Sequence, residues 1–272
     1  MPEIAEVKIM GDFVNYIASE EKFFDQIEKS EVSKVKTDLS GNEGVVYEIA
    51  AKSRGKELML TICPVDGSPP RNLIVTLGMS GNFVYARKDG ASFDRVMKHA
   101  HLRFRTVRGN YLVLHDIRRF AKWKWVDGWT RGRGPCPLTE FNEFSEFLRS
   151  NWYKHKVFNT PLNELLMNQG VFNGVGNYLR AEILYRLDTN PFQPANQLSH
   201  EEMNRLIIFT HHCARDAYIM GGGELKDWVN PKGSDRETFD TWMKCYGKGL
   251  SVVDKTGRRF WYDPRWENYC PY

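Results

Sequence analysis

The second and third residues of the chain place a potential amine nucleophile beside a carboxylate. Removal of Met1 would leave Pro2 with a free secondary amine, and Glu3 follows directly. Such an amine can attack an electrophilic carbon and form an imine, while the neighbouring carboxylate donates or accepts protons. Many chains begin Met-Pro without this chemistry, so the pair acquires meaning only from the other motifs of the sequence.

A basic segment interleaved with aromatic residues is a second signal. Between residues 101 and 125 the single acid is Asp116, whereas seven bases are present: Arg103, Arg105, Arg108, Arg118, Arg119, Lys122 and Lys124. Such a mixture is typical of a surface that contacts phosphates. A solvated basic face of a sheet would show the same composition.

The segment FNGVGNYLRAEIL (172–184) predicts a tight turn and then a helix that begins near Asn177. Gly174 and Gly176 permit the turn, and free amides at a helix N-terminus bind phosphate oxygens. A dinucleotide-binding loop is excluded, because residues 161–170 before it are helical in pattern and the third glycine is missing. An ordinary turn between two helices remains an alternative.

Two motifs carry apolar and planar side chains at strand ends. LGMSGNF (77–83) presents Met79 between two glycines, and HDIRRF (115–120) presents Arg118 and Phe120 on one face. Side chains of this kind can enter a duplex and fill the space left by an extruded base. The alternative is that Met79 and Phe120 are core residues, because Met and Phe are usually buried.

Two hairpin turns each carry a cation. SRGKEL (53–58) places Lys56 just past a turn, and DKTGRRFWY (254–262) places Arg258 beside Gly257. A lone lysine in such a position is equally well explained as a solvent-exposed turn residue.

A β-rich first half and a helical second half must position these motifs. Helical spacing of apolar residues predicts a helix over residues 5–17. Short β-rich segments separated by Gly, Asn or Pro turns follow it, and they predict an antiparallel sandwich or barrel. These segments are residues 44–51, 55–62, 72–81, 101–107 and 110–116.

A Gly- and Pro-rich break at 128–137 predicts a domain boundary. Beyond it the periodicity is helical, and a hairpin with Thr256-Gly257 at its turn ends the pattern. The predicted helices cover residues 139–149, 161–169, 178–187, 201–219 and 235–247. The predicted domains are residues 1–130, residues 131–245 and a finger hairpin of residues 246–272.

Composition excludes several classes of protein. Of the 272 residues 42% are hydrophobic and 26% charged, as in ordinary folded domains. The sequence contains no secretory signal and no run of about 18 apolar residues, so we expect an intracellular protein. The five cysteines are scattered without any Cys-x-x-Cys, which argues against a disulfide framework and a four-cysteine zinc site. A zinc site from Cys245, Cys270, His211 and His212 remains conceivable, although its spacing fits no standard pattern.

Taken together, MPEIAEV, SRGKEL, LGMSGNF, HAHLRF, DIRRF and FNGVGNYLRAEILYR resemble the Fpg/Nei DNA glycosylases in order and spacing. The resemblance runs from Pro2 to Trp261, and it is greatest to the endonuclease VIII-like branch whose C-terminal finger has lost its zinc. It implies an α+β multidomain fold with an N-terminal helix and antiparallel β-sandwich, a helix–two-turn–helix domain and a C-terminal zincless β-hairpin finger. Packing by Trp242, Phe260 and Trp261 would hold that finger in place of a metal.

The resemblance also implies a role for each candidate residue. Pro2 would be the nucleophile and Glu3 the general acid/base, while Glu6 would organise the N-terminus. The other residues would contact DNA. Lys56, Arg258 and Asn177 would bind phosphates, and Met79, Arg118 and Phe120 would fill the void left by the extruded base. Arg215 would read the lesion. Two positions depart from the family pattern: Ala5 stands in place of a proline, and Ala121 stands in place of a glycine.

The implied function is a bifunctional DNA glycosylase and abasic-site lyase of base excision repair. It would remove oxidised pyrimidines and ring-opened purines and cleave the strand by β,δ-elimination. Its partner would be damaged DNA, duplex or single-stranded, and it would act as a monomer without cofactor, metal or membrane, in the nucleus if the source is eukaryotic. Two alternatives stay open, namely a non-catalytic DNA-binding protein and an enzyme of the same kind directed at purine lesions.

Overall fold

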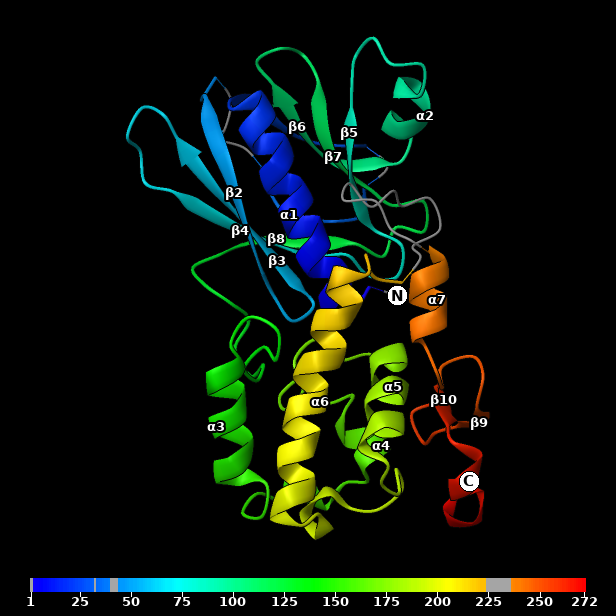
Figure 1. The fold of residues 1–272 in the computed structure, drawn as a ribbon. Coiled ribbons are helices and arrows are strands. Elements are labelled where there is room, and N and C mark those ends of the chain that lie inside the picture. The colour runs from blue at the N-terminus through cyan, green and yellow to red at the C-terminus, as the bar shows by residue number, and fades with distance from the viewer. Residues whose placement is uncertain (1, 32, 40–43, 224–235) are drawn as a thin grey trace. The chain divides into compact units, whose positions relative to one another are not determined.

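The computed structural model describes residues 2–31, 33–39, 44–223 and 236–272, which are drawn in colour in Figure 1. The chain divides into two compact units. The first holds Pro2 and Glu6–Thr130, and the second holds Glu3–Ala5, Arg131–Gly223 and residues 236–272. The division therefore falls inside the Gly- and Pro-rich break, and the finger hairpin belongs to the second unit.

Within its described residues, the first unit contains an antiparallel sheet of eight strands: β1 (Phe24–Lys29), β2 (Tyr47–Arg54), β3 (Glu57–Pro64), β4 (Arg71–Thr76), β5 (Asn82–Ala86), β6 (Ala100–Thr106), β7 (Tyr111–His115) and β8 (Lys122–Val126). Their order is β5-β7-β6-β1-β2-β3-β4-β8. β1 and β2 pair through Phe24 and Tyr47, so two four-stranded halves are joined at that point. The prediction of antiparallel β structure is confirmed.

Three of these strands, β1, β5 and β8, were not predicted, nor was the short helix α2 (Phe93–Met97). β8 alternates exposed Lys122 and Lys124 with buried Trp123. The sequence KWKWV contributes two lysines to the basic segment, and its first four residues alternate polar and apolar side chains as a strand does. Only the charge was used for the prediction.

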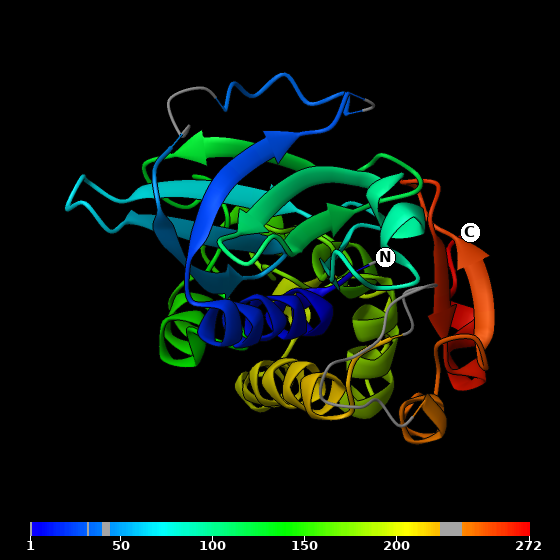
Figure 2. The same cartoon turned by 90° about the horizontal axis from the view of Figure 1, so that it is seen from above.

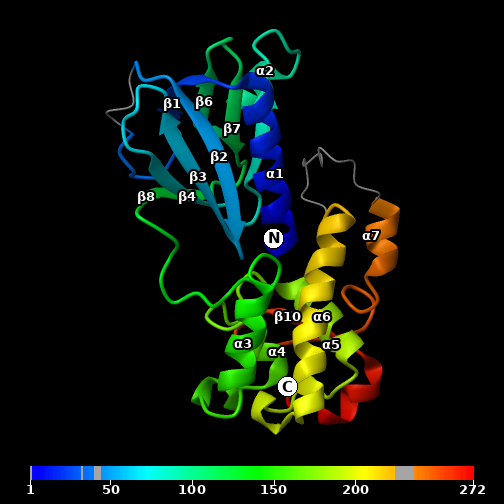
Figure 3. The same cartoon turned by 60° about the vertical axis from the view of Figure 1, so that its left-hand side comes forward.

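Helix α1 (Ile4–Glu21) runs beside β2 and is seen next to it in Figure 3. Met10, Val14 and Ile17 are buried on the face that helical spacing predicted. Asn15 ties the helix to β2, because its side chain donates to the carbonyl of Ala51 (3.0 Å) and accepts from the N–H of Ala51 (2.7 Å). The central strand β2 is thereby fixed to the N-terminal helix.

The described part of the second unit is mainly helical: α3 (Phe141–Asn151), η1 (Lys156–Asn159), α4 (Leu162–Leu165), α5 (Asn177–Leu187), η2 (Ala195–Gln197), α6 (His200–Ile219), α7 (Arg236–Trp242) and η3 (Pro264–Tyr269). A hairpin of β9 (Leu250–Val253) and β10 (Arg259–Tyr262) completes it, and its strands lie side by side in Figure 2. α6 begins with a capping box between Ser199 and Glu202, the motif that marks a helix start. No helix in the described ranges is both long and apolar enough to cross a membrane.

The helix predicted over residues 161–169 is only partly present. α4 makes about one turn, after which the chain continues in turns towards Gly176. The side-chain oxygen of Asn168 accepts from the N–H of Gly170 (2.9 Å), a local bond that competes with helical continuation. This irregular segment brings the backbone to the N-terminus of α5.

Candidate active site

The carboxylate of Glu3 lies at the N-terminus of α5, inside the second unit. It accepts hydrogen bonds from the N–H groups of Gly176 (2.6 Å), Tyr178 (2.9 Å) and Leu179 (3.3 Å), and Glu3 is 2% exposed. The first amides of a helix lack partners within the helix and carry its positive dipole end, so they stabilise a negative charge there. The sequence predicted a phosphate oxygen at this turn, whereas these amides are bonded to a carboxylate of the chain itself.

The two glycines of the turn serve different purposes. Gly174 has φ of 105°, which only glycine adopts readily, and its carbonyl accepts from the N–H of Ile4 (3.1 Å). Gly176 has an extended backbone, but a Cβ there would lie 2.3 Å from Cδ of Glu3. Gly176 therefore provides space for the carboxylate, and the buried Pro2 immediately precedes that carboxylate in the chain. Met1, on whose removal the proposed amine depends, lies outside the described residues.

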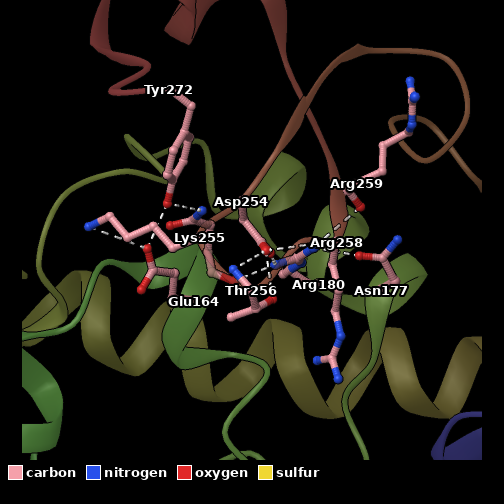
Figure 4. A network of polar contacts seen from close by, with 10 residues as sticks. Glu164, Asn177, Arg180, Asp254, Lys255, Thr256, Arg258, Arg259 and Tyr272 are labelled. Carbon is pink, nitrogen blue, oxygen red and sulfur yellow. Dashed lines mark hydrogen bonds and ion pairs between the residues drawn. The ribbon is translucent and has the colours of Figure 1, made fainter.

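The residues Asn177 and Arg258 both border a buried arginine of the second unit, as Figure 4 shows. The side-chain oxygen of Asn177 accepts from Nη2 of Arg180 (2.5 Å). Arg258 is exposed at the hairpin turn, and its backbone N–H donates to Oδ1 of Asp254 (3.0 Å). The guanidinium of Arg258 points away from this cluster in Figure 4 and is thus open to a ligand.

The void-filling side chains that the resemblance implies, Met79, Arg118 and Phe120, are exposed in the first unit. Met79 is 41% and Phe120 is 44% exposed, and Cζ of the exposed Arg118 lies 4.9 Å from the ring centre of Phe120. The alternative that Met79 and Phe120 are core residues is therefore wrong. A Cβ on Gly78 would approach the backbone of Phe120 to 2.7 Å. The loop that carries Met79 and the loop that carries Arg118 and Phe120 are therefore in close contact.

Asp116 holds both of these loops and was not identified from the sequence as a site residue. Its carboxylate accepts from the hydroxyl of Ser80 (2.6 Å) and from the backbone N–H groups of Arg118 (3.0 Å), Phe120 (2.6 Å) and Ala121 (2.7 Å). Burial would raise the pKa of Asp116, but these hydrogen bonds outweigh it and lower the pKa. A single acid directly after a strand, inside a basic segment, was the available signal.

The other predicted residues lie in the turn between β2 and β3, on α1 and on α6. Lys56 is half-buried in the two-residue turn between β2 and β3, where Gly55 has φ of 57°. Glu6 is buried in the first turns of α1. Arg215 is exposed on α6, just over one turn before its end, as either a lesion-reading residue or a solvated arginine would be.

The basic segment separates into paired and solvent-facing cations. Arg105 makes two hydrogen bonds to Asp25 (2.9 and 3.0 Å), and Arg103 donates to the carbonyls of Ala100 and Met97 (both 3.2 Å). These two arginines support the sheet. A cavity of about 460 Å³ in the same unit is instead lined by exposed cations, namely Lys34, Lys36, Arg119, Lys122 and Lys124, with the acid Glu57.

The residues of the finger do not fit a metal ion. Among the described residues, no group of three or more His, Cys, Asp or Glu side chains is arranged to hold one. Burial raises the pKa of the Cys245 thiol to about 12, so Cys245 is a neutral buried thiol. A ring nitrogen of His211 is hydrogen-bonded to the carbonyl of Pro137 (2.8 Å).

Two models of known protein domains match most of the chain. Residues 1–123 match the formamidopyrimidine-DNA glycosylase N-terminal domain, and residues 134–227 match the formamidopyrimidine-DNA glycosylase H2TH domain. The chain belongs to the formamidopyrimidine-DNA glycosylase family. This glycosylase is a base-excision-repair enzyme for oxidised bases with abasic-site lyase activity.

Nearly the whole length of the glycosylase is similar to endonuclease 8-like 1 proteins and to formamidopyrimidine-DNA glycosylases. It is 35% identical to human endonuclease 8-like 1 over 96% of this chain and 72% of that protein. It is 30% identical to a formamidopyrimidine-DNA glycosylase of Wolbachia over 91% of this chain and 89% of that protein. The resemblance to the Fpg/Nei family and its endonuclease VIII-like branch is thereby confirmed.

Solved structures have the same fold. A Lactococcus lactis Fpg in complex with DNA containing an oxidised pyrimidine has a TM-score of 0.77 at 20% identity and covers 97% of this chain and 98% of that one. The MutM (Fpg) protein of Thermus thermophilus has a TM-score of 0.74 at 24% identity, covering 99% and 100%. The predicted fold class is confirmed.

Proposed function

We propose that this glycosylase acts through an imine formed by the N-terminal amine of Pro2. The amine would attack C1′ of the damaged nucleotide, so that a new N–C1′ bond replaces the bond to the base, which leaves with a proton. The sugar ring would then open, because the C1′–O4′ bond breaks and O4′ takes a proton, and this opening would convert the N-glycoside into an iminium. The iminium is an electron sink. Loss of a proton from C2′ would expel the 3′ phosphate, a second elimination would expel the 5′ phosphate, and water would release the sugar fragment from Pro2.

The observation that carries this proposal is the placement of Glu3. Three backbone amides hold its carboxylate, so the residue that adjoins Pro2 has a fixed position and a stabilised negative charge. A carboxylate beside the reacting sugar can transfer the protons that both eliminations require. Glu6, buried nearby in the chain, would help to fix the same N-terminal segment.

We assign the DNA contacts to two groups of residues. Lys56, Asn177 and Arg258 would bind the phosphates that flank the lesion. Met79, Arg118 and Phe120 would fill the gap in the duplex, which their exposure and their shared anchor on Asp116 support. Arg215 would read the extruded base.

The substrates that we favour are oxidised pyrimidines and ring-opened purines. The support is the 35% identity to endonuclease 8-like 1 and the resemblance of the motifs to that branch. We further propose a monomer with functional domains at residues 1–130, 131–245 and 246–272, which works in the nucleus if its source is eukaryotic.

The test is product analysis in single turnover. Duplexes that carry one thymine glycol, one ring-opened guanine or one intact 8-oxoguanine would be incubated with excess protein. We expect fast cleavage of the first two and a one-nucleotide gap with phosphates at both ends. Faster cleavage of 8-oxoguanine would favour the purine-directed alternative, and products that retain the sugar would contradict the second elimination.

A further inference from the structure

Arg180 is a charged side chain with no exposed surface. It lies in the first turn of α5, one turn after Gly176, and its guanidinium donates in several directions. Nη1 donates to Oδ2 of Asp254 (2.7 Å) and to the carbonyl of Asn163 (3.0 Å), while Nη2 donates to Oδ1 of Asn177 (2.5 Å). Its Cζ also lies 4.7 Å from the ring centre of Phe260 in the finger. One side chain therefore connects α5, α4 and the finger hairpin.

Asp254 is the finger's half of this connection. One carboxylate oxygen pairs with Arg180. The other accepts from the N–H of Thr256 (2.9 Å), the hydroxyl of Thr256 (2.6 Å) and the N–H of Arg258 (3.0 Å). The carboxylate thus defines the hairpin turn from which Arg258 projects, as Figure 4 shows.

A continuous chain of bonds therefore links two residues that we assign to DNA phosphates. It runs from Asn177 through Arg180 and Asp254 to the backbone of Arg258. Asn177 and Arg258 are far apart in sequence, and their side chains do not need to touch for their spacing to be fixed. The planar guanidinium suits this task, because it donates in a rigid fork that lysine cannot reproduce.

We propose that Arg180 and Asp254 are positioning residues, whose buried ion pair sets the spacing of Asn177 and Arg258 and so matches them to the phosphates around the lesion. The inference rests on the proposed function, since it takes those two residues as phosphate contacts. In a finger whose residues do not fit a metal, the ion pair fixes the hairpin turn relative to α5.

A second anchor on α5 provides a matched control. Glu182 is buried and accepts from the N–H groups of Lys244 (2.9 Å), Cys245 (2.8 Å) and Tyr246 (2.9 Å), just before the finger. Arg186 pairs with Glu182 and donates to the carbonyl of Trp242 (2.9 Å). Within the described part of the chain, this anchor stabilises the finger's base and does not include Asn177 or Arg258.

The experiment compares Arg180→Lys with Arg186→Lys in the full chain. Lysine keeps the charge but cannot bridge Asp254 and Asn177 together. We expect Arg180→Lys to lower the slope of log K against log salt on an abasic-site duplex by about 0.9, the value of one phosphate contact on B-DNA. In single-turnover cleavage, Arg180→Lys should raise the half-saturating protein concentration and lower the saturated rate. The first fold-change should be about ten times the second, and a factor of ten corresponds to about 1.4 kcal/mol of binding.

Arg186→Lys should lower the melting temperature without changing the salt slope. Adding Arg258→Ala to Arg180→Lys should leave the slope where Arg180→Lys puts it, because both substitutions remove the same phosphate contact. A folded Arg180→Lys protein with the slope of the native protein would overturn the proposal. If that variant does not fold, Asp254→Asn replaces it, since asparagine keeps an acceptor for the turn and loses the ion pair.

Failure of the proposed function is distinguishable from failure of this inference. If the native protein itself forms no covalent adduct with abasic DNA, the imine mechanism fails. If it forms the adduct and both positioning variants bind DNA with native salt dependence, only the positioning role fails.

Discussion

The position of Glu3 depends on the missing side chain of Gly176. A Cβ at that position would lie 2.3 Å from Cδ and 2.5 Å from Oε1 of Glu3, closer than any real contact, so the carboxylate would have to leave its amides. We expect Gly176→Ala to reduce single-turnover excision on the order of a hundredfold, the range typical of a missing general acid/base. Excision of a damaged base from a duplex measures this directly.

Gly128→Ala is the matched control for Gly176→Ala. A Cβ on Gly128 would meet nothing within 4 Å, so its excision rate should equal that of the native protein. An unchanged rate in Gly176→Ala would mean that catalysis does not require this placement of Glu3.

At the residue scale, residues of a distinctive type could be proposed from the sequence, whereas those that act through distant partners could not. Pro2 and Glu3 could be proposed because their amine and carboxylate stand next to each other at the start of a chain whose other motifs resemble a family that uses such a pair. Asp116 and Asp254 could not, because each acts by accepting from amides whose approach only the folded loops create. Arg180 appeared as an ordinary helix residue, since its partner Asp254 lies 74 positions away.

At the element scale, α5 connects the carboxylate of Glu3, which we propose as the general acid/base, to the finger. Its first amides hold Glu3, and its first turn carries Arg180. The sequence predicted both α5 and α6. α6 has an apolar face over its 20 residues, whereas α5 is buried on most sides and its start was indicated by the glycine turn before Asn177. Of the helix predicted over residues 161–169, only the one turn of α4 is present. Side-chain hydrogen bonds such as that of Asn168 compete with the helix, and apolar periodicity does not reveal them.

The hairpin turn of the finger should contribute to acid sensitivity. Burial would raise the pKa of Asp254, but hydrogen bonds from Arg180 and Thr256 outweigh it and lower the pKa to about 2 from an ordinary 3.8. Because the folded pKa is depressed, the ionised carboxylate stabilises the fold fully above pH 3.8, and this contribution disappears as the pH falls towards 2.

We therefore expect Asp254→Asn to remove about 2 kcal/mol of stability that the native protein loses between about pH 3.8 and pH 2. Urea unfolding at several pH values would show a shallower acid slope for this variant than for the native protein. The exposed Asp127→Asn should keep the native slope. Equal slopes for Asp254→Asn and the native protein would contradict the depressed pKa.

At the scale of the whole molecule, the modest net charge of +4 conceals an uneven surface. The exposed lysines of β8 face a cation-lined cavity, whereas Arg105 is bonded to Asp25. We expect Lys122→Ala/Lys124→Ala to lower the slope of log K against log salt for duplex DNA by up to about 2, with roughly 0.9 for each phosphate that the protein no longer neutralises. Fluorescence titrations at several salt concentrations would measure it.

Arg105→Ala tests whether composition alone determines that slope. Its partner Asp25 is part of the sheet, so the variant should be less stable but should keep the native salt dependence. Equal reductions of slope in both variants would mean that the pairing seen in the fold does not decide which cations meet DNA.

The finger without metal ligands yields a further prediction for the whole protein. No described group of side chains is arranged to hold a metal ion, and the hairpin is held by Arg180 and aromatic packing around Phe260. We expect cleavage to be unchanged after dialysis against a strong chelator. Activity that vanishes on chelation and returns with zinc would contradict the account of the finger.

The most direct test of the central claim is to locate the covalent bond between protein and DNA. Borohydride would be added during cleavage of a duplex with one thymine glycol, and the trapped adduct would be digested with trypsin and mapped by mass spectrometry. We predict that the adduct lies on the amine of Pro2, in the peptide of residues 2–8. An adduct on Lys56, or no adduct from protein shown to lack Met1, would contradict the proposed mechanism.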